Sequence, residues 1–141
     1  MNYSLTLGII LLLEVAVWSG CVGEPPASMP NGTVSVSRAF ERHESNVQIE
    51  DIGVVSRTLA DDTSGLPHQR IIVRLASGQT VLIEHNIDAA PRIDSLREGD
   101  SIAFSGEYIW NSQGGLVHWT HHDRAGRHPP GWLKYNGRVY E

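Results

Sequence analysis

The alternation of apolar and polar positions begins after residue 35 and predicts a protein built mainly from β-strands. From Val47 to Leu59 the apolar positions recur with a period of two, interrupted at Gly53. Because neighbouring side chains of a strand point to opposite faces, this stretch predicts a half-buried strand with a bulge or bend at the glycine. Ahead of it, Ser37–Arg42 predicts a short amphipathic helix with a serine cap.

The next two predicted strands form a hairpin around Gly78, with alternating apolar positions on both sides of the turn. We predict the register that pairs Ala76 with Thr80. In this register Ile71 faces His85, and the other inward positions are apolar. His85 would then lie at the end of the core face.

The alternation stops over residues 87–96, where Pro91 allows only a short helix or an irregular turn. Strands resume at 102–110 and 116–120, and Asn136-Gly137 indicates a final small hairpin. Five strands with a short helical connection between the third and fourth are typical of an OB-fold. We therefore expect an all-β protein with a short helix: a small five-stranded OB-like barrel plus a C-terminal hairpin, with another small barrel or sandwich as the alternative.

The N-terminal segment is typical of an export signal. The apolar run from Leu5 to Val17 is shorter than the roughly 20 residues that a membrane-spanning helix needs. Small residues and then Cys21, the single cysteine of the chain, follow it. This end resembles the lipobox of bacterial lipoproteins, which implies lipidation of Cys21. No Lys or Arg precedes the run and Trp18 replaces the usual leucine, so secretion or an uncleaved anchor are the alternatives.

These features divide the chain into a signal peptide (1–21), a flexible tether rich in Gly, Pro, Ser and Asn (22–34) and a single OB-like domain (35–141). About 120 residues after the leader are enough for one hydrophobic core. We expect a monomeric periplasmic lipoprotein of the bacterial cell envelope, held in the membrane through Cys21. Val22 is not the aspartate that retains lipoproteins in the inner membrane, which favours the outer membrane, with secretion as the alternative.

The charge balance argues against nucleic acid as a partner. The chain has 11 Lys and Arg against 16 Asp and Glu, a net charge of -5. Binding a phosphate backbone requires a basic face. The sequence also has no serine elbow, phosphate-binding loop or paired-cysteine metal motif.

Several blocks of polar and aromatic residues occur in order along the domain. They are Asp61-Asp62 with Gly65, His68-Gln69-Arg70, His85-Asn86-Ile87-Asp88, Ala90-Pro91-Arg92, Gly106-Glu107-Tyr108-Ile109-Trp110-Asn111, His118-Trp119-Thr120-His121-His122-Asp123 and Gly131-Trp132. In these blocks the chain resembles the bacterial domain of unknown function 3465 family over nearly the whole mature domain. It departs from the family pattern at Arg124, where the family has proline. Because the family is uncharacterised, the resemblance implies the domain and no activity.

The segment from His118 to His128 holds four of the seven histidines together with Asp123. Imidazole and carboxylate are ligands for a divalent metal such as zinc or manganese. On an extended strand His121 and Asp123 would share a face about 6.6 Å apart, whereas His118 and His122 would lie too far apart, at about 13 Å, unless the strand bends. The alternative is a polar corner held by hydrogen bonds.

The predicted barrel brings further polar residues to the same rim. The predicted metal ligands are His85, His121, His122, Asp123 and Asp62. The first four are also the candidates for general acid–base catalysis. The alternatives are a turn for Asp62, a surface ion pair for Arg70 and a hydrogen-bonded core position for His85.

A second set of residues suits ligand binding. It comprises Arg70, Asn86, Glu107, Tyr108, Trp110, His118, Trp119 and Arg124. Aromatic surfaces on OB-type barrels bind sugars or single-stranded nucleic acid; alternatively, the rings close the core. In an envelope protein we expect a glycan or an anionic small ligand. We therefore predict a small binding module with a divalent-metal site in its histidine corner, and as the alternative a metal-dependent hydrolase of phosphodiesterase or nuclease type.

Overall fold

The computed structural model describes residues 33–141. The predicted signal peptide, the lipidation site Cys21 and most of the tether lie outside the described residues. No helix in the described part of the chain has the length and hydrophobicity needed to cross a membrane.

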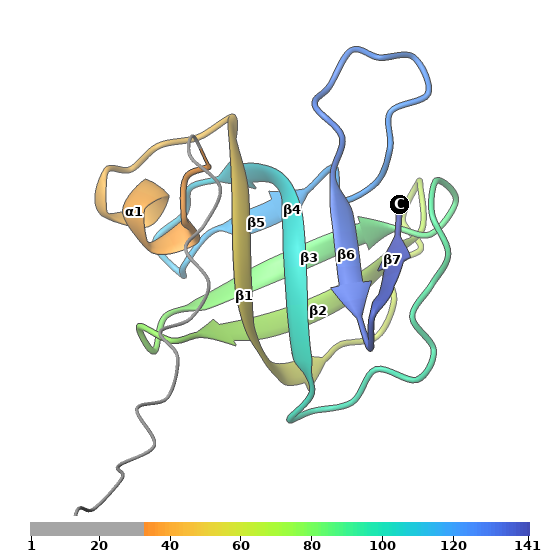
Figure 1. The fold of residues 1–141 in the computed structure, drawn as a ribbon, viewed down its shortest axis with the longest axis horizontal. Helices are drawn as coiled ribbons and strands as arrows, with labels where there is room; N and C mark the ends of the chain where they lie inside the picture. The colour runs from red at the N-terminus through yellow and green to blue at the C-terminus, as the bar shows by residue number, and fades with distance from the viewer. Residues whose placement is uncertain (1–32) are drawn as a thin grey trace, which may run out of the picture.

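Strands dominate the domain, and a single short helix precedes them in the described part of the chain (Figure 1). In order the elements are α1 (Val36–Glu41), β1 (Val47–Thr58), β2 (His68–Leu75), β3 (Thr80–Asn86), β4 (Ser101–Ile109), β5 (Leu116–His118), β6 (Trp132–Tyr135) and β7 (Arg138–Tyr140). The predicted all-β class with a short helix is confirmed.

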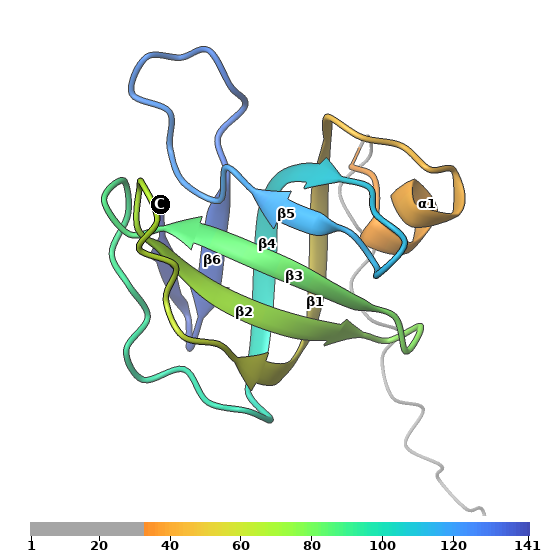
Figure 2. The ribbon, with the colours of Figure 1, turned by 180° about the vertical axis from the view of Figure 1, so that it is seen from behind.

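Five strands close into a barrel. The pairing order is β1-β2-β3-β5-β4, and β1 also pairs with β4, which closes the circle. Four of these pairings are antiparallel, whereas β3 and β5 run parallel. Figure 2 shows β2, β3 and β5 side by side. This arrangement confirms the predicted five-stranded OB-like barrel.

The C-terminal hairpin extends the sheet beyond the barrel. β6 pairs with β4 and β7 pairs with β6, and the hairpin turns at Asn136-Gly137 as predicted. Its inward side chains, Leu133, Tyr135 and Tyr140, belong to the same core cluster as the barrel. The hairpin is therefore part of the one hydrophobic core.

Between β3 and β4 the irregular turn, one of the two predicted alternatives, is present and the short helix is absent: residues 87–100 contain turns and irregular segments. The side chain of Gln69 explains this conformation, because it bonds both backbone groups of Ile93. Gln69 Nε2 donates to Ile93 O (3.0 Å) and Ile93 N donates to Gln69 Oε1 (2.9 Å). The Ile93 N–H is thereby withdrawn from helical bonding, and its carbonyl oxygen accepts only a single turn bond from Leu96 N (3.5 Å) within the backbone.

The helix begins one residue earlier than predicted. Its N-cap is Ser35, whose side chain accepts a hydrogen bond from Arg38 N (3.3 Å). Asp51 of β1 accepts a second bond from Val36 N (3.0 Å). These contacts satisfy two of the free N–H groups at the helix start and fix α1 against the barrel.

The predicted register of the β2–β3 hairpin is wrong by two residues. Arg74, not Ala76, pairs with Thr80, and His85 lies opposite Gln69. The turn is wider than predicted: Leu75 N donates to Gln79 O, and Gly78 has a φ of 85°. Because the error is an even number of residues, every side chain keeps its predicted face.

Of the bulge or bend predicted at Gly53, the bulge lies elsewhere. The register shift of β1 lies between Val55 and Arg57. At Gly53 a Cβ atom would lie 2.5 Å from the Arg74 carbonyl oxygen on β2. The glycine therefore allows close approach of the two strands.

The buried Gln69 side chain provides a test of the fold. It is 3% exposed. We expect Gln69→Met to lower the free energy of unfolding by about 2–3 kcal/mol, because it leaves the buried N–H of Ile93 unpaired and removes one of the two bonds to the Ile93 carbonyl. Urea denaturation measures this change. The exposed Gln113 is the matched control, and Gln113→Met should change stability by no more than about 0.5 kcal/mol; equal losses in the two variants would contradict this role of Gln69.

Candidate functional site

The fifth strand ends before the histidine-rich corner. The prediction extended it to Thr120, but β5 stops at His118, and Trp119 has a φ of 53°, a left-handed conformation that interrupts a strand. Thr120 is fully buried. The prediction that His121 and Asp123 share one face of an extended strand is therefore wrong.

His85 lies inside the barrel, fully buried on β3. Its Nε2 contacts the Pro91 carbonyl oxygen (3.2 Å) and its Nδ1 contacts Thr120 Oγ1 (2.8 Å). A carbonyl oxygen only accepts, so Nε2 carries the proton and Nδ1 accepts the Thr120 hydroxyl. Burial lowers the pKa of His85 from 6.5 to about 4, against the opposing effect of the Pro91 hydrogen bond. His85 is thus a neutral core residue with both nitrogens bonded.

Asp123 organises the loop between β5 and β6, which extends away from the barrel (Figures 1 and 2). Its Oδ1 accepts from Ala125 N (2.9 Å), and its Oδ2 accepts from Arg127 N (2.8 Å) and His128 N (3.2 Å). These hydrogen bonds lower the pKa of the Asp123 carboxyl, and the bond from Ala125 has the largest effect. The carboxylate is therefore committed to the loop backbone.

The other predicted metal ligands have separate surroundings. His121 is nearly buried and donates from Nδ1 to the His122 carbonyl oxygen (3.1 Å), whereas the His122 side chain is exposed. Asp62 accepts from Ser64 N (2.9 Å) within the turn after β1. Over residues 33–141, no three His, Cys, Asp or Glu side chains form a group that could hold a metal ion.

One carboxylate, that of Glu107, contacts two histidines and ties the same loop to β4; the sequence did not indicate this grouping. Glu107 contacts His118 Nε2 through Oε1 (3.1 Å) and His128 Nδ1 through Oε2 (3.5 Å). The ring of Trp119 stacks on His128, with centroids 3.9 Å apart. Because His128 lies ten residues beyond His118 in an irregular loop, no strand or helix spacing could have placed it there.

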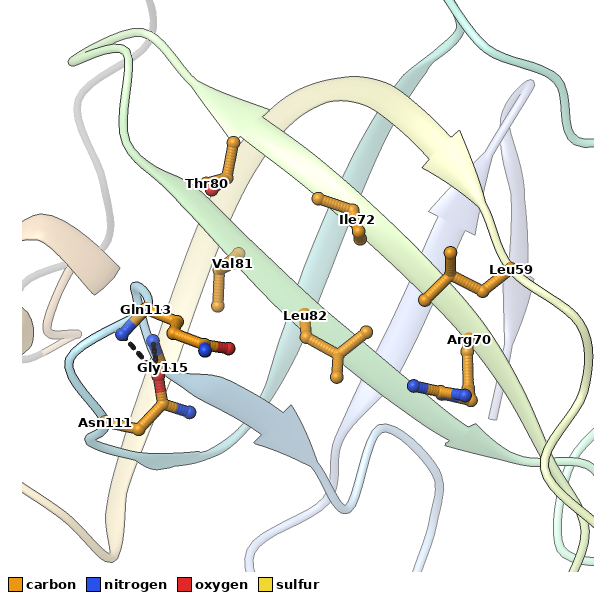
Figure 3. Close-up of a pocket in the computed structure, with 9 residues that line it drawn as sticks. All are labelled: Leu59, Arg70, Ile72, Thr80, Val81, Leu82, Asn111, Gln113 and Gly115. Carbon is orange, nitrogen blue, oxygen red and sulfur yellow. Dashed lines mark hydrogen bonds between the residues drawn. The ribbon is translucent and has the colours of Figure 1, made fainter.

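The outer face of β2, β3 and β5 carries two hollows in one row. The first, shown in Figure 3, lies toward the β2–β3 turn. It is lined by Leu59, Arg70, Ile72, Thr80, Val81, Leu82, Asn111, Gln113 and Gly115. Its β2 and β3 side chains lie largely at outward strand positions, and the rest come from the end of β1 and the β4–β5 loop.

The second hollow lies at the other end of the same two strands. It is lined by Leu66, His68, Glu84, Asn86, His118, Trp119 and His121. Arg70 of the first hollow and Glu84 of the second form an ion pair, 3.7 Å apart, between them. The two hollows therefore lie end to end along the strands with this ion pair between them, and we call them together the strip.

The strip contains some of the predicted ligand-binding residues and omits others. Arg70, Asn86, His118 and Trp119 line it. Glu107 lies behind His118, and Arg124 is exposed on the extended loop.

Two aromatic residues do not belong to this surface, contrary to their predicted ligand-binding role. Tyr108 is fully buried and donates to Gly114 O (3.1 Å), and burial raises the pKa of its hydroxyl. Trp110 packs beside α1, with its ring 6.3 Å from Phe40 and 4.4 Å from His43. Both rings support the fold, which was the alternative considered for the aromatic residues.

The apolar part of the strip was not predicted from the sequence. Ile72 and Leu82 stand at outward positions of β2 and β3, where the alternation expects polar residues. Apolar residues at the solvent-facing positions of two neighbouring strands are the sequence signal from which the first hollow could have been predicted.

The neutral His85 predicts an acid-sensitive stability. Between pH 6.5 and about 4 the unfolded chain protonates this histidine while the folded protein does not, so the free energy of unfolding falls by about 3 kcal/mol in total as the pH is lowered. Urea denaturation across this range measures the slope. In His85→Gln, whose amide can donate to Pro91 and accept from Thr120, the loss should be much smaller.

The exposed His122 supplies the control for this experiment. His122→Gln should keep the wild-type dependence on pH, because it removes an exposed histidine and leaves His85 and its two contacts in place. An unchanged slope in His85→Gln would contradict the assignment of the acid sensitivity to His85.

Two comparisons bear on the identity of the chain. No curated protein sequence matches it significantly. A family model described as "Protein of unknown function (DUF3465)" matches residues 19–141, which include the whole barrel and the C-terminal hairpin. The chain therefore belongs to the DUF3465 family of proteins of unknown function.

Proposed function

We propose that the domain is a glycan-binding module of the bacterial cell envelope and that it binds its ligand along the outer face of β2, β3 and β5. The observation that carries the proposal is the row of two hollows on this one face. OB-type barrels bind oligosaccharides and oligonucleotides on the face of their second and third strands, between the β1–β2 and β4–β5 loops. Residues from both of those loops line the hollows: Leu66 in the second, and Asn111 and Gln113 in the first.

The side chains of the strip suit sugar hydroxyls. Glu84 offers a carboxylate, Asn86 offers the Nδ2 donor of its carboxamide, and His68 offers ring nitrogens. Of the nearly buried His121, only Nε2 is left for a ligand, because Nδ1 donates to the His122 carbonyl oxygen. Trp119 adds an apolar ring at the end of the row. A mostly apolar surface with a few convergent polar groups is the usual chemistry of a small-ligand site.

The charge of the strip supports a glycan rather than nucleic acid. Its strand positions carry one arginine, Arg70, paired with one carboxylate, Glu84. The chain as a whole has a net charge of -5. Such a face lacks the excess of positive charge that binding to a phosphate backbone requires.

The proposed location follows from the N-terminal sequence. A signal peptide over residues 1–21, lipidation at Cys21 and a tether over 22–34 would hold a monomeric domain at the outer membrane, facing the periplasm. There the accessible polymers are envelope glycans.

Chitotetraose, a neutral oligosaccharide, tests the proposal. We expect it to shift the amide signals of β2 and β3 and the indole N–H signal of Trp119 in NMR spectra of the protein. Leu82→Glu places a charge in the middle of the first hollow and should weaken binding at least about tenfold, or about 1.4 kcal/mol. Isothermal titration calorimetry measures the affinity.

Val54→Glu is the matched control, because Val54 is an exposed apolar strand residue on β1, 47% exposed and outside both hollows. It should bind as the wild type does. Thermal unfolding of both variants checks that they fold. No binding by the wild type, or signal shifts confined to β1 and β4, would overturn the proposal.

A further inference from the structure

Arg70 projects from β2 into the first hollow with incomplete pairing (Figure 3). Its Nε is buried and has no hydrogen-bond partner within the described chain. The nearest carboxylate oxygen, Glu84 Oε1, lies 3.7 Å from Nε, beyond hydrogen-bonding distance. A guanidinium presents donors in a planar fork, and leaving a buried donor unpaired costs free energy. The buried Nε is closed to a ligand, but the Arg70 side chain as a whole is 34% exposed. The terminal amino groups of the guanidinium are therefore the donors that an anionic group in the hollow can reach.

The residues around Arg70 indicate which other groups the ligand should carry. Leu82 lies between Arg70 and the carboxamide residues Asn111 and Gln113 of the β4–β5 loop (Figure 3). The Oδ1 atom of Asn111 accepts from Gln113 N (2.9 Å) and Gly115 N (3.1 Å), which leaves its Nδ2 as a donor toward a ligand. The hollow thus offers an anion site, an apolar floor and amide donors in that order.

We infer that this hollow is a subsite for a carboxylate attached to a short apolar group, so that the glycan bound along the strip is an acidic one. The inference rests on the proposed function and names its ligand class. A carboxylate carries one charge and can bond the guanidinium fork through two oxygens. A phosphate monoester carries close to two charges, and its larger cost of desolvation would not be offset by a single arginine that Glu84 already neutralises in part.

Two oligosaccharides with the same backbone separate this inference from the proposed function. Chitotetraose is neutral. A peptide-free peptidoglycan tetrasaccharide has the same linked N-acetylated sugars, but every second sugar carries a lactyl ether, which is a methyl group beside a free carboxylate. We expect the full-length protein in detergent to bind the carboxylated tetrasaccharide at least about tenfold more tightly than chitotetraose, as one additional charge-assisted pair provides.

Two arginine variants on the same face of β2 locate the preference. Arg70→Gln should bind both oligosaccharides equally, because the substitution removes the guanidinium and keeps a polar side chain of similar length. Arg74→Gln makes the same change in charge four residues further along β2 from the second hollow, at an exposed residue outside the first hollow, and should keep the preference. Glu84→Gln should strengthen binding of the carboxylated ligand, because it removes the competing anion.

Each outcome of the calorimetric titrations decides the inference. Equal affinity of the wild type for the two oligosaccharides overturns the carboxylate subsite while leaving glycan binding in place. An equal loss of preference in Arg70→Gln and Arg74→Gln overturns the assignment to Arg70, because it would indicate a general charge effect. Displacement of the ligand by inorganic phosphate but not by lactate overturns the choice of carboxylate. Failure to bind either oligosaccharide overturns the proposed function and the inference together.

Discussion

The arrangement of this domain depends on one neutral imidazole, buried inside the barrel near the end of β3. His85 reaches from β3 to two segments that have no regular structure of their own, Thr120 after β5 and Pro91 in the β3–β4 connection. An uncharged ring satisfies both contacts, whereas a charged ring would have to be desolvated without a counter-ion. The barrel interior therefore selects the protonation state and the tautomer of this histidine.

The contact with Thr120 determines how the chain leaves the barrel. Because Thr120 turns inward, the backbone departs from β5 at Trp119 and the following residues form the extended loop rather than a longer strand. Asp123 then holds the loop together by accepting hydrogen bonds from the loop backbone. The contact of His128 with Glu107 fixes the C-terminal part of the loop to β4. As a result, the outward residues of β2 and β3 share one strip with Trp119 and His121.

The sequence was sufficient to predict the barrel, because the period of two survives in every main strand and the turns carry Gly or Asn-Gly. The face of each side chain also followed from the period, so His85 was correctly expected to point inward despite the error in register. The histidine corner was harder to predict. The positive φ of Trp119, the inward turn of Thr120 and the contact of His128 with Glu107 depend on tertiary contacts that no local spacing encodes.

The closure of the barrel has a consequence for how the protein folds. β1 pairs with β2, which follows it closely, but also with β4, so that Val54 lies beside Ser101 and Val47 beside Tyr108. These partners are distant in sequence, and bringing them together costs loop entropy before any contact is gained. Assembly should therefore be slow for a domain of this size. Until that pairing forms, β1 and β4 present open strand edges that can pair with another chain, which makes the half-built barrel the state most prone to aggregation.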